Sequence, residues 1–114
     1  MSSPAEFEVD AVEAARRAEA GAPVLDVREP DEWEAGRIAE STHIPIDQLA
    51  ARQDEVATDG TIVVVCRSGA RSARVTAELV AAGYDAVNLA GGLHAWVDAG
   101  YPLTADGGAP GTVA

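Results

Sequence analysis

The sequence predicts an α/β fold with a mostly parallel central sheet of about five strands, covered by helices on both faces. Short apolar, β-branched runs alternate along the chain with segments of helical spacing, and a glycine follows most of the helical segments. At 114 residues the chain is long enough for one hydrophobic core. We therefore expect a single three-layer α/β/α domain over residues 1–103.

The first half of the chain predicts short elements with clear ends. Asp10, followed three residues later by Glu13, is typical of a helix N-cap, and Gly21 is a suitable C-terminal stop. Pro30 fits the first turn of a second helix, which Gly36 ends. The expected strands are residues 6–9, 23–27 and 43–44, and the expected helical segments are residues 11–20, 30–35 and about 47–53.

The second half has stronger signals. Residues 61–65 form a β-branched run that is apolar on both faces, as expected for a central parallel strand. Apolar residues at helical spacing predict a helix over residues 72–82, ended by Gly83. A strand over residues 86–89, a turn at Gly91 and Gly92, and a helix over residues 93–99 complete the pattern. The glycine- and proline-rich residues 104–114 predict a flexible tail.

Composition limits the function classes. The chain has 8 basic and 19 acidic residues, for a net charge of −11, which disfavours nucleic acid and anionic membranes as partners. No run approaches the roughly 20 apolar residues of a membrane span, and the N-terminus does not resemble a secretory leader. A single cysteine forms no internal disulfide and offers no metal-chelating pair. We expect a cytoplasmic protein without a metal or another cofactor.

Cys66 is the candidate nucleophile. It directly follows the central strand and opens a turn into the next helix. A thiol at such a turn faces free backbone N–H groups and the positive end of the helix dipole, both of which favour the thiolate. Gly69 suits the curvature of the turn because glycine adopts positive φ without strain. The loop thus predicts an anion-binding nest around the sulfur, at the carboxyl edge of the sheet.

The position of the closing arginine distinguishes between two kinds of thiol enzyme. Protein tyrosine phosphatases and related phosphatases place an arginine six residues after the cysteine, which leaves a loop wide enough for phosphate. Here Arg71 comes five residues after Cys66, and the sixth position is Ser72. A smaller loop should hold a smaller group, such as one extra sulfur atom. In this respect the chain resembles the rhodanese (thiosulfate sulfurtransferase) family.

The resemblance extends over about residues 5–103, well beyond the loop. The matching blocks are residues 25–29 with Trp33 and Gly36, residues 43–45, residues 64–72, residues 83–84 and residues 91–96. One departure concerns the turn after Gly36. Family members commonly read Gly-His-Ile-Pro-Gly-Ala there, whereas this chain continues with Arg37, Ile38, Ala39, Glu40 and Ser41.

The resemblance implies a rhodanese-like domain and a two-step sulfur transfer. Cys66 would take the outer sulfur of a donor such as thiosulfate as a persulfide and pass it to cyanide or a thiol. Loop N–H groups would stabilise that sulfur, Arg67 would recruit the anionic donor, and Arg71 would brace the loop or add positive potential. Asp26 and Arg28 would pair and shape the site. The substrate-binding loop comprises Arg67, Ser68, Gly69, Ala70 and Arg71.

The donor and acceptor stay open at this stage. The implied partners are a small anionic sulfur donor, a thiol or cyanide acceptor, and a thioredoxin-like or other sulfur-relay protein. Two alternative functions are retained. One is a non-catalytic, regulatory rhodanese-like binding module, which the presence of Cys66 disfavours. The other is a thiol-based phosphatase or arsenate reductase, which the shorter loop disfavours.

Overall fold

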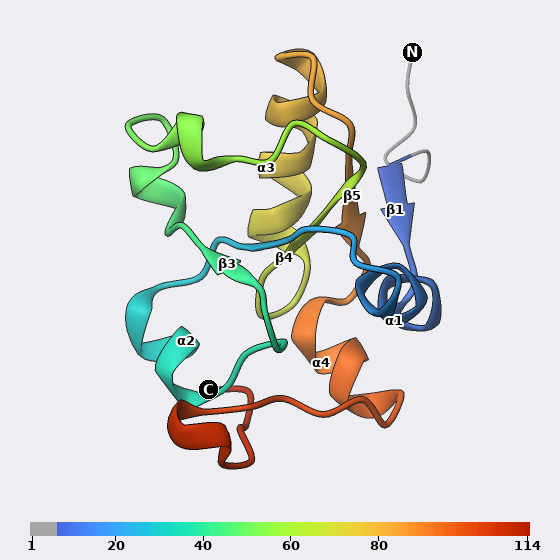
Figure 1. The fold of residues 1–114 in the computed structure, drawn as a ribbon, viewed down its shortest axis with the longest axis vertical. Coiled ribbons are helices and arrows are strands. Elements are labelled where there is room, and N and C mark those ends of the chain that lie inside the picture. Colours follow the sequence, from blue (N-terminus) through green and yellow to red (C-terminus); the bar gives the residue numbers. More distant parts are fainter. Residues whose placement is uncertain (1–6) are drawn as a thin grey trace.

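The computed structural model describes residues 7–114 and contains a five-stranded, all-parallel sheet (Figure 1). The strand order is β1-β5-β4-β2-β3. The strands are β1 (Glu8–Val9), β2 (Val24–Asp26), β3 (Thr42–His43), β4 (Ile62–Val65) and β5 (Ala86–Leu89). The predicted α/β class and sheet are confirmed. Glu6, the expected start of the first strand, lies outside the described residues.

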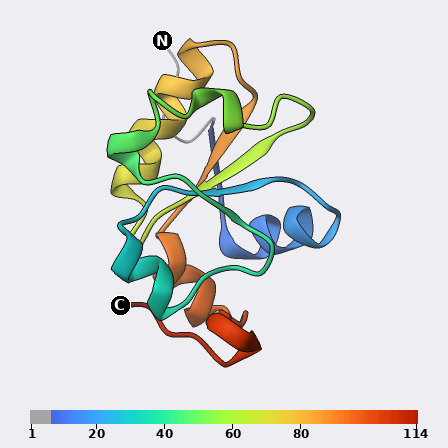
Figure 2. The same cartoon turned by 60° about the vertical axis from the view of Figure 1, so that its left-hand side comes forward.

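Helices lie on both faces of the sheet, and Figure 2 shows α1 and α3 on opposite sides. They are α1 (Ala11–Glu19), α2 (Pro30–Ala35), α3 (Ala70–Ala81) and α4 (Gly92–Asp98). α1 and α4 pack on one face, and α3 packs on the other. The Asp10 carboxylate accepts the N–H of Glu13 at 2.8 Å, as expected of an N-cap.

Two helical segments differ from the sequence-based expectation by more than one residue. α3 begins at Ala70, two residues before the expected start, because the loop turns into the helix as soon as Gly69 has adopted φ +98°. The helical segment expected at residues 47–53 is instead two short 3-10 turns, Ile46–Gln48 and Gln53–Glu55. These turns follow Pro45, and their role is to carry Leu49 and Val56 into the core.

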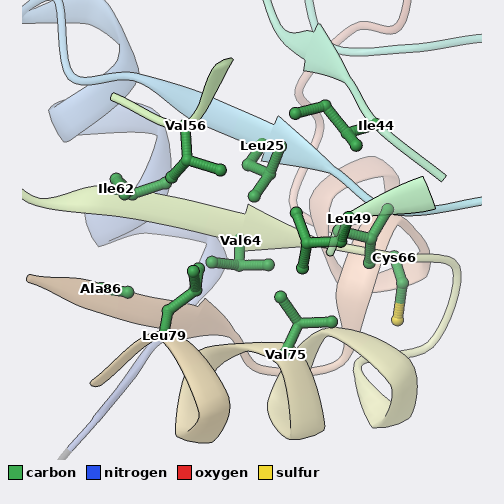
Figure 3. Packing of buried hydrophobic residues seen from close by; sticks show 11 residues of the cluster. Leu25, Ile44, Leu49, Val56, Ile62, Val64, Cys66, Val75, Leu79 and Ala86 are labelled. Atoms are coloured by element: carbon green, nitrogen blue, oxygen red, sulfur yellow. The ribbon is translucent and has the colours of Figure 1, made fainter. Parts of the chain in front are cut away.

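The core has one apolar cluster on each face of β4. Val64 belongs to the cluster under α3, and Val63 belongs to the cluster under α1 and α4. All four residues of β4 are buried, which explains the continuous apolar run in the sequence. Figure 3 shows Cys66 at one end of the cluster under α3, with its sulfur beside the first turn of that helix. The thiol is therefore attached directly to the end of a fully buried strand.

The short helix α2 has no buried residue of its own and is held by polar and aromatic contacts. The Trp33 ring stacks on His43 at 4.7 Å between centroids, and the Arg37 guanidinium covers Trp33 at 4.8 Å. His43 Nε2 lies 2.7 Å from the Arg28 carbonyl oxygen, to which it donates. These contacts fix α2 beside the carboxyl ends of β2 and β3.

The turn that departs from the family pattern keeps a tight geometry. The Ser41 N–H and hydroxyl both donate to the Ile38 carbonyl, at 3.2 and 2.7 Å. Glu40 adopts φ +66°, at the position where the family pattern has glycine. A non-glycine residue in this region costs about 1 kcal/mol. The sequence departure therefore leaves the turn in place at a local cost in backbone strain.

Residues 104–114, predicted from composition as a flexible tail, follow a defined path along the end of α2. Thr104 and Arg37 exchange two backbone hydrogen bonds, of 2.8 and 2.9 Å. Further on, Gly111 crosses Gly36 so closely that a Cβ on Gly111 would lie 2.6 Å from the Gly36 Cα. The segment ends near the Cys66 loop. Its mobility in solution stays a prediction.

Candidate active site

Cys66 lies at the carboxyl end of β4 with its sulfur enclosed by the following loop. The Gly69 N–H donates to Sγ at 3.1 Å, and Ser72 donates through its hydroxyl at 3.2 Å and its N–H at 3.4 Å. The whole cysteine residue is buried. The sulfur therefore accepts hydrogen bonds from the loop backbone, as the sequence predicts, and from one side chain besides.

The nest lowers the pKa of the Cys66 thiol below its ordinary value. Burial is the largest single influence and opposes ionisation, since it removes water from the thiolate. Hydrogen bonds from the Ser72 hydroxyl and from the backbone of Ser72, Gly69 and Ser68 together outweigh it. The influences that lower the pKa of the thiol are thus all hydrogen bonds from neutral donors.

The first residues of α4 hydrogen-bond to the backbone of the Cys66 loop. The Leu93 N–H donates to the Cys66 carbonyl at 2.9 Å, and the His94 N–H donates to the Arg67 carbonyl at 3.2 Å. Gly92 makes this approach possible, because a Cβ there would lie 2.6 Å from both carbonyl oxygens. The Gly91 and Gly92 turn expected from the sequence therefore has a specific purpose, which is close backbone contact with the loop.

The rim of the loop is exposed. Arg67, Ser68 and Ala70 all face solvent, and the Arg67 Nε donates to the Ala114 backbone oxygen at 2.6 Å. The Arg67 guanidinium is thus placed beside the loop and already contacts one oxygen acceptor. This placement fits the expected role of Arg67 in attracting an anion.

Arg71 forms a bidentate ion pair with Glu32 of α2. Its two terminal nitrogens lie 2.7 and 2.8 Å from the two carboxylate oxygens. Hydrogen bonding by Arg71 lowers the pKa of Glu32 to about 2. Of the two roles that the sequence left open for Arg71, bracing the loop is the one that this contact favours.

Asp26 and Arg28 pair as expected, in complete burial. The Arg28 guanidinium contacts both Asp26 carboxylate oxygens at 2.8–3.1 Å and also donates to the carbonyls of Gly36, at 2.7 Å, and Glu32, at 3.0 Å. The pair therefore anchors α2 and the turn after it. Through its bond to the Glu32 carbonyl, Arg28 also contacts the residue that pairs with Arg71.

The sequence reasoning missed two residues at the site. Ser72 was given no role at the sulfur by the sequence analysis, although its hydroxyl, one residue after the loop, lies in the first turn of α3 and faces the sulfur. Glu32 lies 39 residues before Arg71, and only its place after β2, the strand beside β4, hinted at the contact.

None of the helices described within residues 7–114 is long and apolar enough to cross a membrane. In the same part of the chain, no three His, Cys, Asp or Glu side chains are grouped so that they could hold a metal ion.

A family model described as the rhodanese-like domain matches residues 10–99. The chain belongs to the rhodanese-like family. Its relatives include a sulfurtransferase of Allochromatium vinosum, 38% identical over 75% of this chain and 80% of the relative. Another is thiosulfate sulfurtransferase 18 of Arabidopsis thaliana, 37% identical over 86% of this chain and 83% of the relative.

A crystal structure of a rhodanese-related protein from Thermoplasma volcanium has the same fold as this rhodanese-like chain. Its TM-score is 0.80 at 35% identity, and the match covers 85% of this chain and 96% of the other. The fold and the family named by the sequence motifs are thus confirmed, and the relatives are named as sulfurtransferases.

Proposed function

We propose that this protein is a sulfurtransferase that carries a sulfane sulfur as a persulfide on Cys66. The Cys66 thiolate attacks the outer sulfur of a donor such as thiosulfate; the donor's S–S bond breaks, sulfite leaves with the bonding electron pair, and a new S–S bond forms on Cys66. Cyanide or a thiolate then attacks the outer sulfur and restores the Cys66 thiolate. With cyanide the product is thiocyanate, and neither step needs a cofactor.

The observation that supports this proposal is the set of donors directed at the Cys66 sulfur. Gly69 and Ser72 supply two N–H groups and one hydroxyl within 3.4 Å of Sγ. Donors held in place before the reaction stabilise negative charge without reorganising. A persulfide anion carries its charge on the outer sulfur, so the loop N–H groups of residues 67–71 other than that of Gly69 are assigned to that atom.

The arginines have separate roles in this proposal. Arg67, exposed at the rim, orients the anionic donor, while Arg71 is committed to Glu32 and keeps the loop closed. Because Cys66 is fully buried, the donor reaches the sulfur only after groups at the rim move. The contact of Arg67 with Ala114 must open for a donor to replace it.

The acceptor side is inferred from chemistry alone. A persulfide is open to any thiophile that fits the rim, so cyanide, a small thiol or a thioredoxin-like or other sulfur-relay protein would serve. The reducing cytoplasm is the proposed setting because Cys66 must stay a free thiol between turnovers. The strongly acidic composition makes nucleic acid an unsuitable partner.

Intact-mass spectrometry after incubation with thiosulfate tests the proposal. The expected result is a mass gain of one sulfur atom, which disappears when cyanide is added and thiocyanate appears. Cys66→Ser should show no gain and only background thiocyanate. Arg74→Gln is the matched control, because Arg74 is an exposed arginine on α3 outside the loop, and it should behave as the wild type.

The same preparation distinguishes the alternative functions. Hydrolysis of para-nitrophenyl phosphate that depends on Cys66, without any mass gain, would replace the proposal by a phosphatase. Absence of both reactions in a folded protein with a reactive thiol would favour the non-catalytic module.

A further inference from the structure

Asn88 is the one polar residue of β5. It lies between the partly buried Val87 and the buried Leu89 in sequence, and it is 2% exposed. It shares a sheet face with Ala86, which belongs to the cluster under α3. Burying an amide at this position costs free energy unless hydrogen bonds compensate for the lost water. The hydrogen bonds of Asn88 should therefore explain why an amide is found here.

The Asn88 amide links β1, β5 and the sulfur loop. Its Nδ2 donates to the Gly69 carbonyl at 3.3 Å and to a Glu8 carboxylate oxygen at 3.1 Å. The strand register places Asn88 beside Glu8 on one side and Val64 on the other. Two acceptors on the Nδ2 side identify it as the amide nitrogen, since the alternative orientation would place the oxygen against two other oxygens.

In the orientation that lets Asn88 donate to the Gly69 carbonyl, the amide oxygen has no hydrogen-bond partner. Asn88 Oδ1 is the one fully buried side-chain nitrogen or oxygen atom among residues 7–114 that lacks a hydrogen-bond partner. Leaving a buried acceptor unpaired is costly. A leucine of similar size would avoid this cost, so packing alone does not account for asparagine here.

Gly69 is the residue that needs such an anchor. Its φ of +98° suits glycine, but glycine also has the widest backbone freedom of any residue. Its N–H donates to the Cys66 sulfur at 3.1 Å. Its carbonyl accepts from the Ala73 N–H at 3.1 Å as well as from Asn88. Two donors from different elements fix the direction of that carbonyl and so restrict the rotation of the residue.

We propose that Asn88 is a positioning residue that holds Gly69 in the conformation in which its N–H points at the Cys66 sulfur. Asn88 does not contact the sulfur itself. By restricting the backbone of Gly69, it keeps the Gly69 N–H directed at the sulfur. The thiolate, and the persulfide of the proposed function, are thereby stabilised by a donor that is in place before the reaction. This inference rests on the proposed function only where it predicts a change in the rate of sulfur transfer.

The test measures the ionisation of Cys66 directly, through the pH profile of iodoacetamide alkylation. Asn88→Leu removes both donors and the unpaired oxygen at similar size, and Asn88→Ala is a second variant in case leucine overpacks. We expect both to raise the pKa of Cys66 by about 0.5 to 1 unit. At a pH at least one unit below the wild-type midpoint, alkylation and thiocyanate formation should then fall roughly three- to tenfold.

Val87→Ala is the matched control. Val87 neighbours Asn88 in sequence but packs in the cluster on the opposite face of the sheet. We expect it to lower the thermal midpoint of unfolding without moving the pH profile. If the Asn88 variants lower thermal stability like Val87→Ala and leave the profile at its wild-type midpoint, Asn88 is a structural residue and the inference is wrong.

Alkylation requires no sulfur transfer, so the two proposals fail separately. A shifted alkylation profile in a protein that forms no persulfide would reject the sulfurtransferase function and keep the role of Asn88. Normal persulfide formation with an unshifted alkylation profile in both Asn88 variants would keep the sulfurtransferase function and reject the role of Asn88.

Discussion

Two arginine and carboxylate pairs lie at the carboxyl edge of the sheet, and they differ mainly in burial. Asp26 and Arg28 pair with no exposed side-chain surface. Glu32 and Arg71 pair with 14% and 35% of their side chains exposed. Both contacts are bidentate, with nitrogen to oxygen distances of 2.7–3.1 Å.

The difference in burial assigns the pairs to different tasks. A fully buried charge is tolerated only while its partner and its hydrogen bonds are present. Arg28 therefore has a structural role, and its removal should destabilise the folded state. A partly exposed pair contributes less to stability because water screens it. Its geometry can instead serve the site, since Arg71 closes the sulfur loop and Glu32 holds it there. Three predictions test this division, from the largest effect to the smallest.

Removing the buried cation should have the largest effect. Arg28→Met leaves the Asp26 carboxylate buried without a counter-ion, and we expect a loss of about 3–5 kcal/mol in unfolding free energy. Urea unfolding followed by circular dichroism measures it. The double variant Asp26→Leu with Arg28→Met should recover part of the loss, because it strands no charge. A double variant as unstable as the single one would mean that lost bonds to the Gly36 and Glu32 carbonyls dominate.

The exposed pair should have a smaller and pH-dependent effect. Arg71 holds the folded-state pKa of Glu32 at about 2, below its ordinary value of 4.5. A depressed carboxyl pKa stabilises the fold above the unfolded value, and that contribution disappears as the pH falls through 4.5 towards 2. At about pH 6 we expect Glu32→Gln to cost about 1 kcal/mol.

Urea unfolding of both proteins across this pH range checks the sign. The wild-type advantage over Glu32→Gln should shrink steadily on acidification, while other carboxyl groups affect the two proteins alike. An advantage that stays constant with pH would show that Glu32 acts through packing and not through its charge.

The fold was predictable because its signals are local. The β-branched run at residues 61–65, the Asp10 cap and the glycines after the helices each specify an element from a few neighbouring residues. The helical segment expected at 47–53 forms two short 3-10 turns in place of one continuous helix, because Leu49 and Val56 must be placed in the core. That requirement exists only once the sheet has formed.

The site divides in the same way. Cys66, Gly69 and Arg71 follow from one loop and its spacing, so sequence reasoning found them. The partners of that loop come from elsewhere in the chain: Glu32 from α2 and Asn88 from β5. Neither lies in a motif with Cys66, and only the parallel strand order brings them to it.

The smallest expected effect is on the thiol itself. The charge of the Cys66 thiolate raises the pKa of Arg71, so the Arg71 cation in turn favours the thiolate, and the Glu32 carboxylate paired with Arg71 carries the opposite charge. Glu32→Gln should therefore lower the pKa of Cys66, and Arg71→Met should raise it, each by about 0.3–0.5 unit. Iodoacetamide alkylation against pH measures both shifts, with Arg74→Gln as the unshifted control. Opposite signs would show that the pair acts on the sulfur through charge. Shifts of the same sign would mean instead that either substitution distorts the loop, and the exposed pair would then be as structural as the buried one.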